Sequence, residues 1–293
     1  MPHVPVLLQE VLDVLDPNVG EFFIDGTAGG GGHARELLAR VGRTGKVLAI
    51  DWDATQANAL KKSLRTPHAY VVHGNYTDLP MLLKEMHLSR ADGLLLDLGF
   101  STEHIEHSGR GFSFVRDEPL LMTYDDSLVP VKDLLRRMHE RELAHVLFRF
   151  GEERYARRIA GAIKEAERKS FVRTSGALAE IIVRAVPKQY AHGRIHPATR
   201  TFQALRILAN RELENLETLL RALPEVMNEG GRVAVISFHS LEDRIVKNAF
   251  RALVKEKQAE LISKKPITPT LKEQEANPKA RSAKLRALLM THA

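Results

Sequence analysis

Three aspartates stand where a short apolar run ends, and a glycine-rich stretch follows the first of them. Asp25, Asp51 and Asp97 follow the runs Phe22–Ile24, Val47–Ile50 and Leu94–Leu96. Carboxylates at the ends of buried strands accept hydrogen bonds from sugar hydroxyls, and glycines let a ligand lie against bare main chain. These residue types in this order predict a binding site for a nucleotide-type ligand.

The glycine-rich stretch runs from Gly26 to Gly32 and is followed by an amphipathic segment, residues 34–41. This order predicts a strand, a tight loop and a helix N-terminus, the first part of a nucleotide-binding α/β domain. A tight turn that binds no ligand would use the same glycines. Asp51 favours a ligand, because it lies about where dinucleotide folds place the acid that binds the ribose.

The charge of Asp25 bears on which ligand the loop takes. A carboxylate at the mouth of the loop would repel a pyrophosphate lying on the helix N-terminus, which disfavours NAD. S-adenosylmethionine carries an ammonium group and no phosphate. We therefore predict S-adenosylmethionine as the cofactor, with Asp25, Gly29 and Asp51 among the residues that bind it. Tyr76, after the third predicted strand, either lies against the adenine ring or caps the core.

The elements that must position these residues alternate along the first hundred positions. A short helix over 4–15 precedes predicted strands over 22–25, 46–50, 69–72 and 93–99, with helices over 34–41, 53–64 and 79–86 between them. The last strand is almost continuously apolar, as a parallel sheet buried on both faces requires. The carboxyl end of that strand, which bears Asp97, is expected to open into the ligand site. The fold class predicted is α/β with a mostly parallel sheet.

The alternation then stops, and a helical insertion follows. Helices are predicted over 131–138, 140–150, 153–168, 175–185 and 198–209. A helix over 212–227, a turn over 228–231 and a strand over 232–238 return the chain to the sheet. The remaining tail is predicted to be an extended arm with two edge strands, near 261–266 and 284–289. The expected domains are a core of residues 1–104 and 211–293 and an all-helical insertion of residues 105–210.

The formal net charge of +6 is unevenly distributed. Residues 1–129 carry −7, residues 130–211 carry +10, residues 212–243 carry −5 and residues 244–293 carry +8. Two basic blocks that flank an acidic core suit a polyanion gripped at the edges of a catalytic domain. Solvated helix faces are the alternative explanation for such charge.

Several protein classes are excluded by what the chain lacks. It has no cysteine, so disulfides and thiolate metal sites are absent. No apolar run approaches the ~20 residues of a membrane span, and the first five residues have no presequence character. No cluster has convincing metal-ligand spacing, and no metal is predicted. We expect a cytoplasmic protein without a membrane partner.

Eight motifs, in order, resemble one family. They are His3–Leu8, Gly29–His33, Leu95–Gly99, Arg110–Phe114, Phe150–Arg154, His196–Arg206, Ile236–Arg244 and Asn277–Ser282. Together they resemble the bacterial RsmH (MraW) family over nearly the whole chain. The resemblance implies a class I, Rossmann-like methyltransferase with an inserted helical domain. It also implies methyl transfer from S-adenosylmethionine to the exocyclic N4 of a cytidine in the decoding region of 16S ribosomal RNA, within the small ribosomal subunit.

The resemblance also implies roles for individual residues. Gly31, Gly32 and His33 would line the cofactor, Asp51 would bind its ribose, and Tyr76 would lie near the adenine. Asp97 matches an acid that contacts the cofactor, and His104 stands where the family usually has glutamine. After the Gly-Phe-Ser-Phe motif the family reads Pro-Leu-Asp-Met-Arg-Met-Asp, but this chain has Leu121 and Thr123 at the acid and the base. That departure leaves open whether the activity is altered.

For substrate residues the sequence offers candidates, each with an alternative. Asp97 is the candidate catalytic residue, as an acceptor that holds the amine, or else it only binds the cofactor. Arg110, Arg200, Gln203, Arg206 and His239 are candidates for contact with RNA. Spacings of three place Arg200, Gln203 and Arg206 on one helical face, which would contact RNA or form internal ion pairs. His239 would form part of a polar wall or cap a helix, and Ser240 with Asp243 resembles a capping box.

Three other functions compete with this interpretation. An NAD(P) oxidoreductase would need a loop that tolerates phosphate. A divergent RNA-binding paralogue, non-catalytic or retargeted, finds support in Leu121 and Thr123. Another nucleic-acid methyltransferase is the third, because the motifs do not reveal the target nucleotide. The sequence leaves the oligomeric state open, a homodimer included.

Overall fold

The computed structural model describes residues 5–99, 108–191 and 195–291. Its backbone forms two compact units. The core unit contains Met1–Gly99 and Leu213–Ala293, and the helical unit contains Phe100–Glu212.

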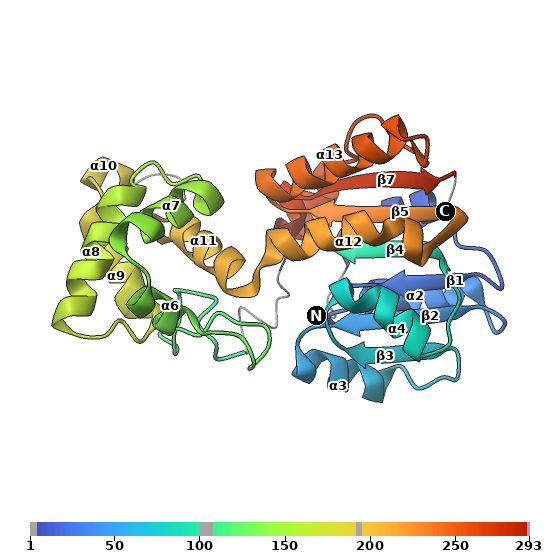
Figure 1. Cartoon of the computed structure of the whole chain (residues 1–293), viewed down its shortest axis with the longest axis horizontal. Helices are drawn as coiled ribbons and strands as arrows, with labels where there is room; N and C mark the ends of the chain where they lie inside the picture. Colours follow the sequence, from blue (N-terminus) through green and yellow to red (C-terminus); the bar gives the residue numbers. More distant parts are fainter. Residues whose placement is uncertain (1–4, 100–107, 192–194, 292–293) are drawn as a thin grey trace. The chain divides into compact units, whose positions relative to one another are not determined.

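The core unit is built on a seven-stranded sheet in the order β3-β2-β1-β4-β5-β7-β6 (Figure 1). Its strands are β1 (Phe22–Asp25), β2 (Lys46–Asp51), β3 (Ala69–His73), β4 (Ala91–Asp97), β5 (Met227–Ser237), β6 (Ala259–Leu261) and β7 (Lys284–Met290). Strands β1 to β5 run parallel to one another, and β7 is antiparallel to β5 and β6. The prediction of an α/β fold with a mostly parallel sheet is confirmed.

Helices cover both faces of this sheet, which explains why its central strands are apolar throughout. They are α1 (Leu8–Leu15), α2 (Gly32–Val41), α3 (Ala54–Ser63), α4 (Leu79–Glu85), α12 (Glu212–Val226), α13 (Ser240–Lys255) and α14 (Leu271–Ala276), with short 3₁₀ turns η1 (Tyr76–Asp78) and η2 (Pro278–Ser282). One buried cluster joins α4, α12 and α13 to the sheet, and another joins α1, α2 and α3 to it. Figure 1 shows α4 and α12 over the same face.

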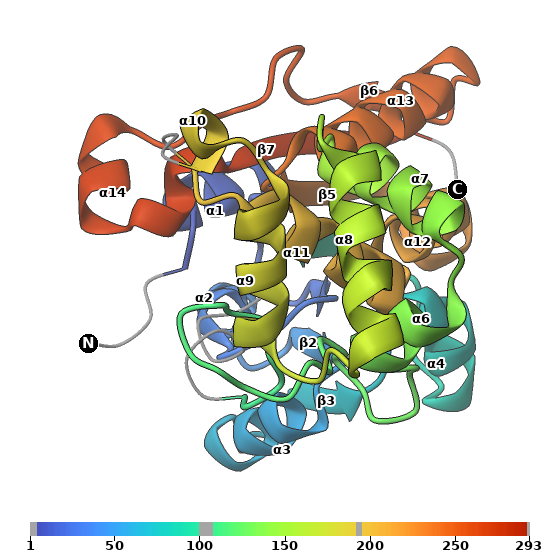
Figure 2. The ribbon, with the colours of Figure 1, turned by 90° about the vertical axis from the view of Figure 1, so that its left-hand side faces the viewer.

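The C-terminal tail differs from the prediction of an extended arm. Strand β7 is buried between β5 and β6 and is therefore not an edge strand, although β6 is one. Leu285 and Leu288 are fully buried and contribute to the two faces of the sheet. The tail also forms α14, which lies beside α1 in Figure 2, and Leu7 N donates to Glu273 Oε1 at 2.7 Å. The apolar alternation of 284–290 marks a strand but not its place in the sheet.

The turn expected over 228–231 is also wrong, because β5 begins at Met227. The pairing with β4 is irregular there, since Met227 pairs with Ala91 and the next pair is Arg232 with Gly93. The backbone of Gly230 has a φ of 77°, which glycine adopts without strain. The glycines therefore accommodate a bulge within the strand.

The helical unit packs around its own apolar core. Its helices are α6 (Val131–Arg137), α7 (Glu140–Gly151), α8 (Ala156–Lys169), α9 (Ser175–Ala185), α10 (Lys188–Ala191) and α11 (Ala198–Asn210). Side chains such as Leu147, Ile159, Ile163, Ile182 and Leu205 are fully buried. Helix α7 packs on α8 and α11, and α8 runs beside α9 (Figure 2). Five of these helices match the predicted ones within a few residues.

Candidate active site

The three aspartates named above lie together at the carboxyl edge of the parallel strands. In the sheet register, Asp25 is level with Ala49 of β2 and Leu95 of β4. Asp51 and Asp97 therefore extend two residues beyond Asp25, one on each side of it. Strands β2 and β3 lie on one side of β1, and β4 lies on the other side. The order in which strands are added to the sheet therefore reverses between β1 and β4. Open α/β sheets bind ligands at such a switch point.

The glycine loop crosses this edge and leads into α2. Gly31 is the N-cap of α2 with a φ of 76°, and a Cβ there would lie 2.3 Å from Leu60 Cδ1. A Cβ on Gly32 would lie 2.4 Å from Pro5 Cγ, so packing alone explains both glycines. At Gly30, by contrast, a Cβ would meet no atom of the described residues within 4 Å. The loop is therefore open to a ligand at Gly30.

Asp51 braces the loop from the end of β2. Its Oδ2 accepts a 2.6 Å hydrogen bond from Gly29 N, and its Oδ1 accepts one of 2.8 Å from Asp53 N. Asp53 caps α3 by accepting from Thr55 N and Gln56 N. Tyr76 begins η1, is partly buried, and packs against the core cluster of α4 and α12.

Asp97, at the end of β4, has one oxygen that the described residues leave without a hydrogen bond. Its N–H donates to Thr27 Oγ1 at 2.6 Å, which fixes its backbone against the glycine loop. Its Oδ1 is inaccessible to solvent and has no hydrogen-bond partner among the described residues. Burial raises the pKa of Asp97 well above its ordinary value, and the carboxylates of Asp25 and Glu242 raise it further.

His33 lies on the other side of the Asp97 carboxylate. It is the second residue of α2, its ring is 6% exposed, and its Nδ1 is 3.7 Å from Asp97 Oδ2. Its Nε2 is 3.1 Å from the carbonyl oxygen of Val6. The ring is thus held between the N-terminal segment and Asp97.

Asp25 is buried beneath the loop. Burial raises its pKa to about 7, the hydrogen bond from Thr27 N lowers it, and the charge of Asp51 raises it. Asp25 Oδ1 accepts from Thr27 N at 3.2 Å. A carboxyl group with a pKa near neutrality ionises readily when a cation is placed beside it.

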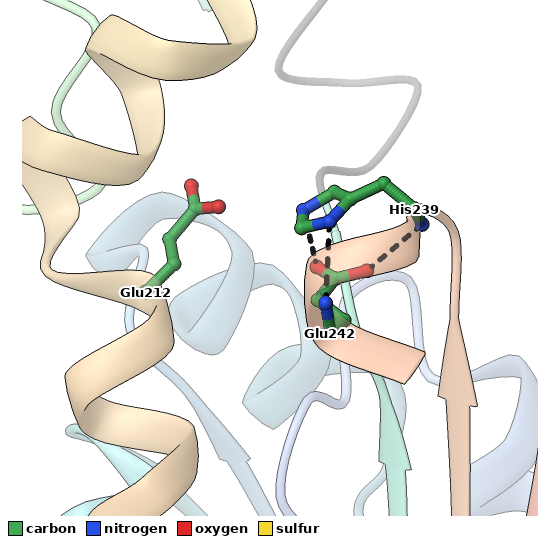
Figure 3. A group of neighbouring side chains, drawn as sticks. All are labelled: Glu212, His239 and Glu242. Atoms are coloured by element: carbon green, nitrogen blue, oxygen red, sulfur yellow. Dashed lines mark hydrogen bonds and ion pairs between the residues drawn. The ribbon is translucent and has the colours of Figure 1, made fainter. Parts of the chain in front are cut away.

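His239 and Glu242 form the N-terminal cap of α13 (Figure 3). Glu242 N donates to His239 Nδ1 at 3.3 Å, and Glu242 Oε2 accepts from the N–H of Phe238 and of His239 at 2.8 and 3.2 Å. The capping box is one residue earlier than the pair Ser240 and Asp243 suggested. Asp243 instead binds Arg286 of β7, at 2.7 Å.

The candidate RNA-contacting residues of the helical unit bind other parts of that unit. Arg110 donates to Thr123 O at 3.2 Å and to Asp126 at 2.7 Å. Arg200 and Gln203 donate to the carbonyls of Glu152 and Phe150. Their shared face therefore packs on the end of α7.

Arg206 is buried at 5% exposure and forms two hydrogen bonds with Glu212, of 2.8 and 3.0 Å. Figure 3 shows Glu212 at the start of α12. An RNA phosphate could reach Arg206 only by displacing this carboxylate. The internal ion pair, which the sequence analysis left as the alternative, is the role that the geometry favours for Arg206.

The segment that departs from the family pattern is folded into the helical unit. Thr123 is buried and accepts from Arg110 through its carbonyl and its hydroxyl. Asn210 joins both flanking residues, since its Nδ2 donates to Met122 O and its Oδ1 accepts from Tyr124 N. The hydroxyl of Tyr124 also donates to Glu212, at 3.1 Å. This segment is thus tied to α11 and α12.

Two features of the site were not predicted. One is the hydrogen bond from Asp97 N to the hydroxyl of Thr27. A hydroxyl in the loop, two residues after Asp25, could have indicated such a contact. The pKa of Asp97 is raised first by burial and then by the charges of Asp25 and Glu242, and the sequence does not connect Glu242 with Asp97. His104 lies outside the described residues.

The residues present fit S-adenosylmethionine. The open surface at Gly30 leaves room for a ligand. Asp51 lies at the same edge as Asp25 and Asp97, whose raised pKa values mean that they ionise most readily when a cation is bound beside them. The buried, unpartnered Asp97 Oδ1 is an acceptor that the fold does not use.

Comparison with known proteins agrees with this arrangement. The family model of the MraW methylase family matches residues 1–290. Ribosomal RNA small subunit methyltransferase H from Coprothermobacter proteolyticus is 42% identical over 97% of this chain and 94% of the relative. The protein of the same name from Anaeromyxobacter sp. is 43% identical over 98% and 97%, and that from Nitrosomonas europaea 42% over 97% and 96%. Across the described residues, no helix combines the length and apolarity needed to cross a membrane. The chain belongs to the MraW methylase family and is an S-adenosylmethionine-dependent methyltransferase.

Proposed function

We propose that this enzyme methylates the exocyclic N4 of a cytidine in the decoding region of 16S ribosomal RNA, within the small ribosomal subunit. The names of the relatives support the RNA and the subunit. The observation that carries the choice of an amine is the partly exposed Asp97 carboxyl group at the carboxyl end of β4, one oxygen of which has no hydrogen bond among the described residues. A small-subunit substrate places the enzyme in the cytoplasm.

The chemistry of a cytosine amine explains why such an acceptor is needed. The lone pair of N4 is delocalised into the ring, so the amine is a weak nucleophile. The cofactor, when bound, supplies a methyl group on a sulfonium, which is already activated. The protein therefore has to align the amine with that methyl group and accept hydrogen bonds from the amine. The Asp97 carboxyl group, which is 20% exposed, would accept one of them.

The cofactor would be held by the residues that surround Asp97. Asp51 would accept hydrogen bonds from the ribose hydroxyls, and the glycine loop would lie against the cofactor at Gly30. Asp25 would place a carboxylate near the ammonium group, and Tyr76 would lie near the adenine. These roles follow from the positions of the residues at the carboxyl edge of the sheet.

The helical unit is the part of the chain that we assign to RNA binding. Residues 130–211 carry a net charge of +10. Exposed arginines on α7 and α8 include Arg141, Arg149, Arg157, Arg158 and Arg168. Exposed cations of this kind neutralise RNA phosphates. The target base has to leave its stack to reach the end of β4, because a stacked base cannot approach the methyl group in line.

The test is methyl transfer to small ribosomal subunits that lack the modification. Purified enzyme and S-adenosylmethionine with a radiolabelled methyl group are incubated with the subunits, and the RNA is digested to nucleosides. We expect the label in N4-methylcytidine, and in a fragment of the decoding region isolated before the digestion. Label in another nucleoside would overturn the proposed target.

A divergent paralogue, non-catalytic or retargeted, is the second candidate function. It is favoured by Leu121 and Thr123, which replace an acid and a base of the family pattern. Thr123 is buried and binds Arg110, so the segment is packed without those charges. A protein that binds S-adenosylmethionine and small subunits but transfers no label would support this candidate.

A further inference from the structure

The imidazole of His33 has an oxygen atom of Val6 on one side and one of Asp97 on the other. These two atoms bear on which ring nitrogens carry a hydrogen. The ring Nε2 is 3.1 Å from Val6 O, and a carbonyl oxygen only accepts hydrogen bonds. Nε2 therefore carries a hydrogen, and in the neutral ring Nδ1 is an acceptor. The other side of the ring faces Asp97, with Nδ1 3.7 Å from Oδ2.

Two acceptors that face each other in a site with little water repel, which favours a proton on the pair. Neutral His33 opposite ionised Asp97 would place a lone pair against a carboxylate, in a region where His33 is 6% exposed. One proton removes the conflict, either on Nδ1 as an imidazolium or on Oδ2 as a carboxylic acid. Both arrangements give a pair with no net charge that holds a single proton.

We propose that His33 is a positioning residue that shares one proton with Asp97 and thereby holds the Asp97 carboxyl group for the substrate amine. This inference rests on the proposed function, since the amine is the substrate assigned there. His33 acts through Asp97 rather than on the substrate.

The charged groups around the pair favour retention of this proton. Among the described residues, Asp25 acts on Asp97 from β1 and Glu242 acts on it from α13. Asp51 acts in turn on Asp25 from β2. The Nε2 atom of His239 lies 3.1 Å from Glu242 Oε1. The surroundings are thus acidic, and they stabilise a proton on the pair.

The pair also accounts for the proton that the reaction releases. The bond from N4 to the methyl carbon forms while the bond from that carbon to sulfur breaks, and the electron pair of the broken bond stays on sulfur. N4 then gives up one proton to the Asp97 carboxylate. The pair now holds two protons, as a cationic His33 beside a neutral Asp97. The positive charge lost from sulfur is therefore retained within the acidic site, and one proton later passes to solvent.

The first test follows the His33 ring by nuclear magnetic resonance in the full-length, cofactor-free protein with isotope-labelled histidine. His33→Gln identifies the His33 signals among the 13 histidines. In the wild-type protein, Nε2 should keep the ¹⁵N shift of a protonated nitrogen throughout the titration, while Nδ1 changes. In Asp97→Asn, the His33 titration midpoint should fall by about 1 to 3 pH units, as expected on loss of an adjacent opposite charge.

Two results of this experiment would overturn the proposal. One is an unprotonated Nε2 in the wild-type protein, a measurement that needs no folded variant. The other is a His33 titration that is identical in the wild-type protein and in Asp97→Asn. His145, exposed on α7, is the internal control, and its signal should titrate alike in both proteins.

The second test separates positioning from structure by kinetics. Glutamine at position 33 can still donate to Val6 O but has no counterpart of Nδ1 facing Asp97. We expect His33→Gln to lower kcat at least tenfold, to change the KM for the cofactor less than threefold, and to alter the pH dependence of kcat. His87→Asn, at an exposed position just after α4 in the core unit, should leave all three unchanged.

A wild-type kcat and pH profile in His33→Gln would overturn the proposal, as would loss of cofactor binding with normal kcat at saturation. The outcomes also distinguish this inference from the proposed function. Coupled titration of His33 and Asp97 without N4-methylcytidine among the products would retain the pair and reject the target base.

Discussion

The two units of this chain treat buried charged side chains in opposite ways. In the helical unit, Arg206 is bonded twice to Glu212, and both oxygens of the fully buried Glu153 accept hydrogen bonds, from Tyr155 N and from Tyr190 OH. Burial and the Glu153 carboxylate raise the pKa of Tyr190 to about 12, so it remains a donor. In the core unit, Asp97 keeps an oxygen without a partner among the described residues.

This difference distinguishes buried charged groups that stabilise the fold from those that await a ligand. A buried charge that is fully hydrogen-bonded can serve the fold, whereas one left without donors destabilises it. The raised pKa values of Asp25 and Asp97 record that cost. Groups of this kind cluster at active sites, where a ligand supplies the missing partner. The comparison therefore favours a role in ligand binding and chemistry for Asp25 and Asp97 of the core unit, and a role in stability for Glu153 and Glu212 of the helical unit.

The largest effect expected from this comparison is on the pH dependence of stability at Asp25. The pKa of Asp25 is about 7 in the folded protein and 3.8 in the unfolded chain. Below about pH 4 both states are protonated, but as the pH rises to 7 the unfolded chain ionises first, and folding loses about 4 kcal/mol. Asp25→Asn should therefore gain stability over the wild-type protein as the pH rises from 4 to 7, and level off above 7.

Urea unfolding followed by the fluorescence of Trp52, the single tryptophan, measures this in the core unit. Glu36→Gln, at an exposed position of α2, is the matched control. A gain in stability that is the same at every pH would show that folding does not raise the pKa of Asp25.

Arg206→Ala should destabilise the protein by about 3 kcal/mol, because it leaves the largely buried Glu212 without its cation. Thermal unfolding measures the loss, and calorimetry should find cofactor affinity unchanged. Arg184→Ala, which breaks an exposed pair with Glu180, should cost only about 0.3 kcal/mol. If the two variants lose equal stability, burial does not distinguish these pairs. Loss of cofactor affinity in Arg206→Ala would show that the stabilising ion pair also serves the site.

Asp97→Asn should reduce turnover at saturating cofactor by roughly 10²-fold or more, because the amide removes the charge that holds the amine. It should also unfold at a higher temperature than the wild-type protein, since a poorly solvated carboxylate is removed. Methyl transfer to small subunits and thermal unfolding test both halves. If cofactor affinity collapses while turnover at saturation is preserved, Asp97 binds the cofactor and is not catalytic.

The sequence was sufficient for features that depend on local pattern. Apolar runs ending in Asp25, Asp51 and Asp97 predicted the parallel strands, and the structure places these residues at one edge of the sheet. The sequence does not predict the position of β7. Apolar residues alternate only in part along Lys284–Met290, and such a strand can lie at the edge of a sheet or between two other strands. The glycines before Arg232 predict a turn, but they form a bulge in β5. The sequence does not distinguish the two, because glycine is typical of both.

Side-chain partners were harder to predict than elements. Spacing alone placed Arg200, Gln203 and Arg206 on one face of a helix, but it does not reveal what packs against that face. Their partners come from the end of α7 and from Glu212, at sequence separations of 48, 53 and 6 residues. Likewise, the pKa of Asp97 is raised by burial and by the charges of Asp25 and Glu242, and only the folded sheet brings these residues together.

Asp51 gives the smallest expected effect and the most informative test, because it belongs to the site yet both its oxygens are bonded. If hydrogen bonding alone marked a structural role, Asp51 would only brace Gly29 and α3. We instead expect ribose hydroxyls to share its oxygens, so Asp51→Ala should weaken cofactor binding by about 1 to 3 kcal/mol in calorimetry. Asp92→Ala is the matched control, because Asp92 accepts from Phe22 N and Asn228 Nδ2 at the amino end of β4. Both variants lose an acid that accepts two hydrogen bonds, but only Asp51 lies at the edge where the ligand binds. Equal cofactor affinity in the two variants would show that Asp51 is a brace for the loop and not a ligand-binding residue.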